Sequence, residues 1–175
     1  MSETMTKPGQ SDSKPAERPA NQRGVARLAA VQALYQLEIT RAPVADVIAE
    51  FELFRLKQDI EGADWRALDL SWFRGIVAGV VNDQREIDPK VNEALAADWP
   101  LKRVDATLRA MLRCGVYELL RRADVPARVI ITEYVDVAKA FFDGDEPRMV
   151  NGVLDRIGRE MRPTEMSGSP RPQKA

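Results

Sequence analysis

The sequence contains no histidine and only one cysteine in its 175 residues. Without histidine the chain cannot build a Ser-His or Cys-His catalytic pair, and it lacks the commonest side-chain ligand of zinc. The single cysteine, Cys114, excludes an intramolecular disulfide, and its apolar neighbours Met111, Leu112 and Val116 indicate a buried side chain. The carboxylates lie at the spacings of surface helices rather than in a catalytic group. The sequence therefore predicts a protein that is not an enzyme and needs no metal or cofactor.

Long apolar segments are missing as well. No apolar run approaches the roughly 18 residues that a membrane span requires, and the N-terminus lacks the charged-then-apolar pattern of a signal peptide. With 45% apolar and 30% charged residues, the chain fits one domain with a sizeable core, or two small subdomains that share one. We expect a cytoplasmic protein that makes no membrane contact.

Large apolar side chains are also nearly absent from both ends of the chain. Residues 1–21 are rich in Ser, Pro, Lys, Glu and Gln, and residues 163–175 have the same character. Such segments cannot bury enough surface to offset the entropy lost on ordering. The sequence therefore predicts one folded domain over residues 22–162, with a disordered tail on each side.

Between the tails, apolar residues recur every three or four positions, and strand-like alternation never persists. This pattern predicts an all-α fold of about seven helices. Glycine, proline and capping residues set the expected limits: about 24–40, 43–56, 64–80, a short helix after Pro89, about 100–123, and one helix on each side of a break at Gly144. Gly75 and Gly79, one helical turn apart, are expected to let another helix approach closely. Trp65, Trp72 and Trp99 are assigned to the core.

The last two helices are predicted to form an antiparallel pair. Gly144 stops the first of them, Asp145 can cap the second, and a proline is tolerated in the first turn that follows. The Asn151-Gly152 pair inside the second helix is locally unfavourable, because Gly costs roughly 1 kcal/mol against Ala. We therefore expect close helix approach at Gly152 and a side-chain hydrogen bond from Asn151, and we assign Asp155 a structural role.

Residues 124–155, DVPARVIITEYVDVAKAFFDGDEPRMVNGVLD, resemble the C-terminal signature of the NusB family of bacterial transcription antitermination factors. That signature is a DVP turn followed by an ELAK-F helix and a K-F-VNGVLD helix. Residues 26–35, ARLAAVQALY, match the family's AR---VQALY block, and residues 112–119, LRCGVYEL, match its LR-A-YEL block. The three blocks stand in family order within about residues 22–162. The resemblance implies two packed three-helix subdomains.

The resemblance also implies a function and a set of partners. NusB proteins bind the boxA element of ribosomal RNA leader transcripts together with NusE, a small-subunit ribosomal protein. The complex then joins the RNA polymerase elongation complex with further Nus factors and suppresses termination. Relatives include monomers and homodimers, so the sequence leaves the oligomeric state open.

The start of the first helix is the first predicted RNA contact. Arg23 and Arg27 lie four residues apart, and we expect both to project to one side for phosphate contact while Leu28 and Val31 turn toward the core. The resemblance supports this, because the family uses an arginine-rich N-terminal motif to bind boxA. Here a glycine and a valine interrupt that motif, which predicts weaker intrinsic RNA affinity.

Two further predicted contacts rest on the matched blocks. Tyr35 ends the VQALY block, where the family places its tyrosine near RNA and a base can stack on the ring; a core tyrosine with a satisfied hydroxyl is the alternative. Arg148 and Met149 match the KF pair before VNGVLD, with methionine in place of a ring that could stack. Asp145 aligns with a family acidic position at the same edge.

Charge is distributed unevenly along a chain whose net charge is only −1. Residues 43–98 carry six basic and twelve acidic side chains, whereas residues 99–128 carry seven basic and three acidic ones. Phosphate binding needs only a local positive surface, so this segregation permits a basic face. Arg109 and Arg113, one turn apart in the basic region, are predicted RNA contacts. A salt bridge, for instance with Glu118 or Glu133, is the alternative for them.

Two other functions remain open from the sequence. A NusB-like module also occurs fused to RNA methyltransferases, but this chain lacks the Gly-rich cofactor-binding βα segment of such an enzyme. The other is an RNA-independent helical scaffold, whose acidic second and third helices would bind a basic partner. Binding to boxA RNA, compared with a scrambled strand, distinguishes the scaffold from an RNA-binding factor.

Overall fold

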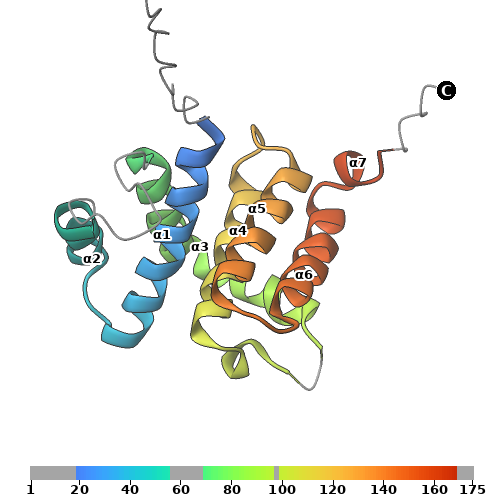
Figure 1. Ribbon diagram of the computed structural model, residues 1–175. Coiled ribbons are helices and arrows are strands. Elements are labelled where there is room, and N and C mark those ends of the chain that lie inside the picture. Colours follow the sequence, from blue (N-terminus) through green and yellow to red (C-terminus); the bar gives the residue numbers. More distant parts are fainter. Residues whose placement is uncertain (1–18, 56–68, 97–98, 169–175) are drawn as a thin grey trace, which may run out of the picture.

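The structure, a computed structural model, describes residues 19–55, 69–96 and 99–168. Every regular element in this part of the chain is helical, as the sequence predicts (Figure 1). The main helices are α1 (Pro19–Thr40), α2 (Val44–Glu50), α3 (Leu70–Ala94), α4 (Ala106–Arg121), α5 (Ala127–Phe141), α6 (Glu146–Met161) and the short α7 (Pro163–Met166). A π-helical turn, Phe51–Arg55, continues α2, and a 3₁₀ turn, Leu101–Arg103, precedes α4.

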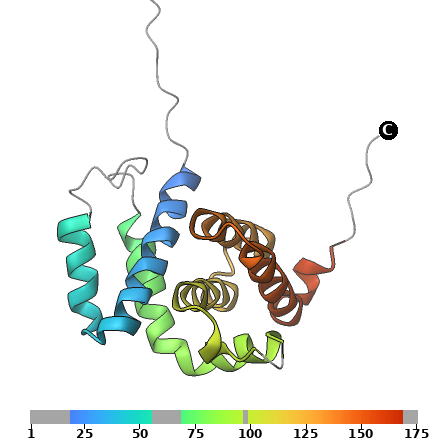
Figure 2. The same ribbon diagram turned by 60° about the horizontal axis from the view of Figure 1, so that its bottom comes forward.

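Helix α4 is at the centre of the fold. It contacts α1, α3, α5 and α6, and both views show α1 and α2 on one side of it and α5 and α6 on the other (Figures 1 and 2). Helices α1–α3 and α4–α6 are thus the two halves that the family resemblance implies. A single apolar core runs through both halves and includes Phe73, Ile76, Met111, Leu112, Cys114 and Leu154. No helix in the described ranges is both long and apolar enough to cross a membrane.

Helix α3 continues through Pro89, where the sequence predicts a break and a separate short helix. Pro89 lies inside the helix on its exposed side, and a proline there costs about 3 kcal/mol. Ile87 and Val91 are fully buried on either side of it, and their burial offsets that cost. The predicted short helix is therefore the last part of α3.

The start of α4 also differs from the prediction. The helix begins after Asp105 rather than at Pro100, because the Asp105 carboxylate accepts hydrogen bonds from the backbone N of Thr107 at 2.8 Å and of Leu108 at 3.3 Å. These bonds cap the helix. Trp99, assigned to the core, is instead exposed beside the 3₁₀ turn.

The predicted antiparallel pair of helices is α5 and α6, but its local details are different. Asp145 occupies the N-cap position without making a side-chain cap hydrogen bond. Gly152 is exposed, and a Cβ built on it would meet nothing within 4 Å, so the expected close helix approach is wrong. Asn151 is exposed too, and no hydrogen bond of its side chain is found among the described residues.

The two glycines of α3 have opposite surroundings. A Cβ on Gly79 would lie 2.2 Å from the ring of Tyr117 on α4, whereas a Cβ on Gly75 would meet nothing within 4 Å. The predicted close approach therefore holds at Gly79 and not at Gly75.

This contrast gives a matched pair of variants. Gly79→Ala is expected to lower the free energy of unfolding by about 1–3 kcal/mol through overpacking. Gly75→Ala is expected to raise it by about 0.5–1 kcal/mol, because an exposed helical alanine replaces a glycine. Urea unfolding followed by circular dichroism measures both, and equal effects of the two substitutions would contradict the packing of Tyr117 on Gly79.

The chain beyond Arg162, predicted to be a tail, continues as α7 and packs on the domain. Met166 is buried and lies against Gly158. The Glu165 carboxylate accepts a hydrogen bond from the backbone N of Ala127, the first residue of α5. The predicted tail is therefore wrong for residues 163–168. The segment has few large apolar groups, which is why the sequence predicts disorder, but Glu165 provides a hydrogen-bond acceptor for the first N–H group of α5. Of the tail predicted for residues 1–21, residues 19–21 belong to α1, and residues 1–18 lie outside the described residues.

Candidate nucleic-acid interface

Arg27 lies in the core rather than on the surface. Its side chain is 3% exposed, and its Nε and Nη2 donate hydrogen bonds of 2.9 and 2.8 Å to the two carboxylate oxygens of Glu118. Glu118 is fully buried and also accepts a hydrogen bond from the hydroxyl of Tyr134. Glu133 lies 3.6 Å from the Arg27 Nη1. The predicted accessibility of Arg27 is therefore wrong, and a phosphate cannot reach it in this structure.

The electrostatics of this group favour an ion pair. Burial disfavours the charged guanidinium, but the hydrogen bond and charge of Glu118 outweigh burial and raise the pKa of Arg27. Burial, followed by the charge of Glu118, raises the pKa of the Tyr134 hydroxyl, which therefore remains a donor. Arg27, Glu118 and Tyr134 thus join α1, α4 and α5 at the centre of the domain.

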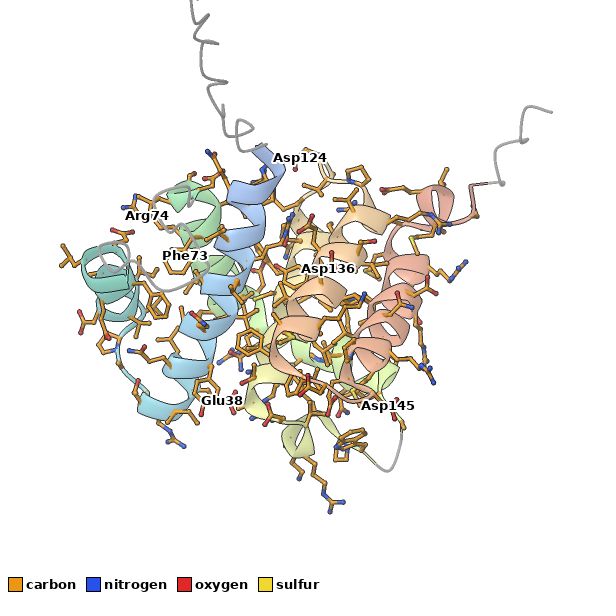
Figure 3. The ribbon with its side chains drawn as sticks, in the orientation of Figure 1. Glu38, Phe73, Arg74, Asp124, Asp136 and Asp145 are labelled. Atoms are coloured by element: carbon orange, nitrogen blue, oxygen red, sulfur yellow. The ribbon has the colours of Figure 1, made fainter. Side chains whose placement is uncertain are left out.

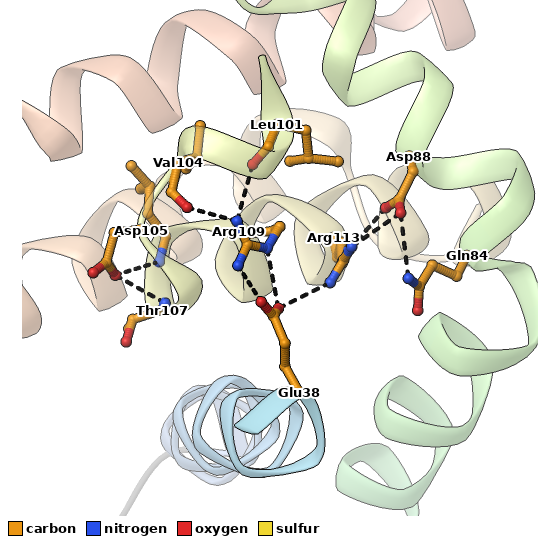
Figure 4. A network of polar contacts seen from close by, with 10 residues as sticks. Glu38, Gln84, Asp88, Leu101, Val104, Asp105, Thr107, Arg109 and Arg113 are labelled. Atoms are coloured by element: carbon orange, nitrogen blue, oxygen red, sulfur yellow. Dashed lines mark hydrogen bonds and ion pairs between the residues drawn. The ribbon is translucent and has the colours of Figure 1, made fainter. Parts of the chain in front are cut away.

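Arg109 and Arg113 belong to a second polar network, between α1, α3 and α4 (Figure 4). Arg109 binds the Glu38 carboxylate and donates to the backbone carbonyls of Leu101 at 3.0 Å and Val104 at 2.6 Å. Arg113 donates to both carboxylate oxygens of Asp88, at 2.8 and 2.9 Å. The hydrogen bond from Arg109 holds the pKa of Glu38 below its usual range.

The salt-bridge alternative for Arg109 and Arg113 is therefore the one found, although with other partners than Glu118 and Glu133. Both side chains are mostly buried, and their donors are directed to groups of the protein itself. They fix α4 against α1 and α3 below the surface. The basic character of residues 99–128 is to this extent neutralised inside the fold.

Tyr35 lies at an open groove between α1, the start of α4 and the end of α5. The ring is 43% exposed, and that of Phe141 across the groove is 38% exposed. The groove encloses about 370 Å³ and is lined by Gln32, Tyr35, Gln36, Ile39, Thr40, Thr107 and Phe141. No hydrogen-bond partner of the buried Gln32 Oε1 is found in the part of the chain that the structure describes. The groove thus combines aromatic faces with amide and hydroxyl groups, which suits an unpaired base.

Phe141 is a groove residue that the sequence does not indicate. Its spacing with Ile131 and Tyr134 predicts a core position on α5, but it is the last residue of that helix. Its ring lines the groove and contacts that of Phe142, with ring centroids 6.5 Å apart. The helical period alone does not predict the exposure of Phe141, because this exposure depends on where α5 ends.

Arg148 and Met149 lie in the first turn of α6, at the same end of the molecule as the groove (Figure 1). Arg148 is exposed, and no ion pair is found for it within the described ranges, whereas Met149 packs partly against the core. Glu38 and Asp145 are labelled at this end in Figure 3, and the Glu38 carboxylate is paired with Arg109 and Arg113. Tyr35 and Phe141 therefore line the groove together, and Arg148 lies outside its lining in the first turn of α6.

Arg23 lies elsewhere. It is twelve residues before Tyr35 on α1, about 18 Å away at the helical rise of 1.5 Å per residue. Its guanidinium Cζ stacks 3.9 Å from the centroid of the Trp72 ring.

No group of three or more acidic or cysteine side chains in the described part of the chain could hold a metal ion.

The chain is similar to known proteins of one family. The model of the NusB family matches residues 25–159. The chain belongs to the NusB family. The transcription antitermination protein NusB of Mesorhizobium japonicum is 57% identical over 145 residues, 83% of this chain and 94% of the relative. That of Agrobacterium fabrum is 57% identical over 149 residues, 85% of this chain and 90% of the relative.

Solved NusB structures share the fold. A structure of T. maritima NusB has a TM-score of 0.68 and 30% identity, covering 82% of this chain and 95% of that one. A crystal structure of antitermination factors NusB and NusE in complex with dsRNA has a TM-score of 0.63 and 26% identity, covering 80% and 97%. The resemblance noted in the three sequence blocks thus extends to the arrangement of the helices.

Proposed function

We propose that this NusB-family protein is an RNA-binding antitermination factor that binds the boxA segment of single-stranded RNA together with NusE. Family membership supports this, as does a related NusB whose structure contains NusE and dsRNA. The observation in this chain that carries the proposal is the groove at Tyr35, which offers rings and amides to an unpaired base. The RNA complex would then join RNA polymerase with further Nus factors.

The candidate residues that are exposed or half-buried have distinct roles in this proposal. Tyr35 stacks on a base, Met149 makes an apolar contact with the strand, and Arg148 pairs with a phosphate. Arg23 supplies a phosphate contact at the far end of α1. Arg27, Arg109 and Arg113 act through the fold, because their guanidinium groups hold the helices that carry the groove. No covalent chemistry is required.

Comparison of two RNA strands tests the proposal. Affinity is measured for a boxA-containing single strand and for a scrambled strand of equal length, each with and without NusE. We expect the boxA strand to bind more tightly, and the preference to grow with NusE because two weak surfaces act on one strand. Sequence-blind affinity in the presence of NusE would favour the RNA-independent scaffold.

Tyr35→Ala tests the groove itself. Because stacking of a base on an aromatic ring contributes roughly 1–3 kcal/mol, we expect boxA affinity to fall by roughly 5- to 150-fold. The melting temperature should hardly change, because the ring is 43% exposed. Val129→Ala on α5, which truncates a side chain exposed to 44% and outside the groove, is the control. Unchanged RNA binding by Tyr35→Ala would remove the groove from the RNA path.

A further inference from the structure

A second cavity lies at the opposite end of α1 from Tyr35, where the first turns of α1 meet the start of α3 and the end of α4. It encloses about 240 Å³ and is lined by Arg23, Asp69, Ser71, Trp72, Gly75, Ile76, Tyr117 and Arg122. Asp124, which pairs with Arg122, is labelled at this end beside the start of α1 in Figure 3. None of the groove residues lines this cavity.

Guanidinium groups converge on one indole in this cavity. The Cζ of Arg23 lies 3.9 Å and that of Arg122 4.0 Å from the centroid of the Trp72 ring, and the buried Arg27 lies at 5.6 Å. Attraction to the ring holds each cation, but the cations repel one another. Arg27 is neutralised by Glu118. Arg122 is paired with Asp124, so Arg23 is the cavity cation for which no ion pair is found among the described residues.

These two arginines keep donors available. A guanidinium that stacks on a ring still directs its N–H groups outward in its own plane. Arg122 donates from Nε and Nη2 to Asp124, at 3.1 and 2.9 Å, which leaves Nη1. Arg23 has no ion pair within the described ranges.

Three of the other polar side chains of the cavity, Ser71, Trp72 and Tyr117, also carry donors. Trp72 is 7% exposed, and no acceptor for its buried Nε1 is found within residues 19–55, 69–96 and 99–168. No hydrogen bond is found for the hydroxyls of Ser71 and Tyr117 among the described residues. The one lining carboxylate, Asp69, accepts a 2.9 Å hydrogen bond from the backbone N of Trp72. The cavity therefore offers more donors than acceptors, and an unpartnered buried donor costs about 1–3 kcal/mol.

We propose that this cavity binds a phosphate group between Arg23 and Arg122, with the hydroxyls of Ser71 and Tyr117 as further donors. A phosphate brings several strong acceptor oxygens and negative charge to a site that has donors and two cations. The volume is below the roughly 300 Å³ of pockets that hold drug-sized ligands, so it suits a phosphate better than a whole nucleotide. The phosphate comes from the RNA backbone or from solution. In the first case the inference rests on the proposed function and extends the RNA path.

Trp72 supplies a spectroscopic probe. In the full chain with Trp65→Phe and Trp99→Phe, Trp72 is the only tryptophan. Its fluorescence is followed while inorganic phosphate, or the boxA single strand, is added at constant ionic strength. We expect a saturable change with inorganic phosphate, and with RNA if the strand supplies the phosphate.

Arg122→Gln and Arg121→Gln form the matched pair of variants. Both remove one positive charge at the end of α4, but Arg121 pairs with Asp83 and Glu86 outside the cavity. Arg122→Gln loses a charge-assisted hydrogen bond, so its phosphate affinity should fall by about tenfold. The phosphate affinity of Arg121→Gln should equal that of the wild type. Tyr117→Phe, which keeps the ring against Gly79, should weaken it a few-fold and guards against misfolding of the arginine variant.

The outcomes separate the two proposals. If Arg122→Gln also lowers RNA affinity and reduces its salt slope by about one, the phosphate belongs to the RNA backbone. If the substitution weakens the binding of inorganic phosphate but not of RNA, the site binds a free phosphate.

Other outcomes would overturn one of the two proposals. Loss of RNA binding in Tyr35→Ala, together with no saturable phosphate signal, overturns the phosphate site and leaves the proposed function intact. Equal effects of Arg121→Gln and Arg122→Gln would overturn the cavity as well. Phosphate binding by a protein that ignores boxA would overturn the proposed function alone.

Discussion

Replacing Arg27 with methionine is expected to lower the free energy of unfolding by about 3–5 kcal/mol, because the variant leaves the Glu118 carboxylate buried without its cation. The hydroxyl of Tyr134 remains a donor to that carboxylate, but it carries no compensating charge. Urea unfolding at neutral pH, followed by circular dichroism, measures the loss. Any fall in RNA affinity should follow the fraction of unfolded protein rather than the number of phosphate contacts.

Two further variants sharpen this experiment. Arg27→Met combined with Glu118→Leu removes both charges and should recover much of the stability that the single substitution loses. Arg156→Met breaks only a solvent-exposed contact with Glu160, at 3.6 Å, and should change stability by less than about 0.5 kcal/mol. An Arg27→Met protein that unfolds at the wild-type urea concentration yet binds RNA with a smaller salt slope would contradict the buried pair.

Arg162→Ala should also be strongly destabilising, by about 3 kcal/mol. The Arg162 side chain is 10% exposed, and it donates to four backbone carbonyls where α4 ends and the chain turns into α5. The acceptors are Glu118, Leu119, Arg122 and Val125, at 2.6–3.1 Å. The carbonyls of Glu118 and Arg122 also accept backbone hydrogen bonds, from the N–H groups of Arg122 and Val125. Among the described residues the guanidinium is the only donor found for the carbonyls of Leu119 and Val125, which lose their partner without it.

The neighbouring arginine is the control for this prediction. Arg159 pairs with Asp155 one turn away on the surface of α6, so Arg159→Ala should cost less than about 0.5 kcal/mol. Arg162→Lys should recover little, because a single ammonium cannot match the planar fork that serves four carbonyls. Urea midpoints of the three variants measured together decide the matter, and similar midpoints for Arg159→Ala and Arg162→Ala would mean that the carbonyls are solvated.

The regular helices could be predicted because their signals are local. Apolar periodicity marks α1, α4, α5 and α6, and the turn at residues 124–126 marks the boundary between α4 and α5. The continuation of α3 through Pro89 could not be predicted, because burial of Ile87 and Val91 by other helices decides it. Exposure of Trp99 likewise depends on where the 3₁₀ turn meets the core.

The candidate site could be predicted only in part. Tyr35 and Arg148 are exposed, as the three family blocks imply. Arg27 has the same local signal as Arg23, four residues away, and only Glu118, 91 residues later in the chain, distinguishes them. A one-dimensional pattern cannot show a partner at that separation. The groove at Phe141 and the cavity at Trp72 are not predicted either, because each is lined by residues of several helices.

The contacts of Arg162 and Glu165 have a consequence for synthesis of the protein. Glu165 follows its partner Ala127 by 38 residues, and Arg162 follows Leu119 by 43. While the chain emerges from the ribosome, α4 and α5 are therefore exposed before the residues that close their shared corner. A nascent chain paused at that stage offers apolar surface and free carbonyls to chaperones and proteases. The contacts of Arg162 and Glu165 with α4 and α5 can form only after α7 has been translated.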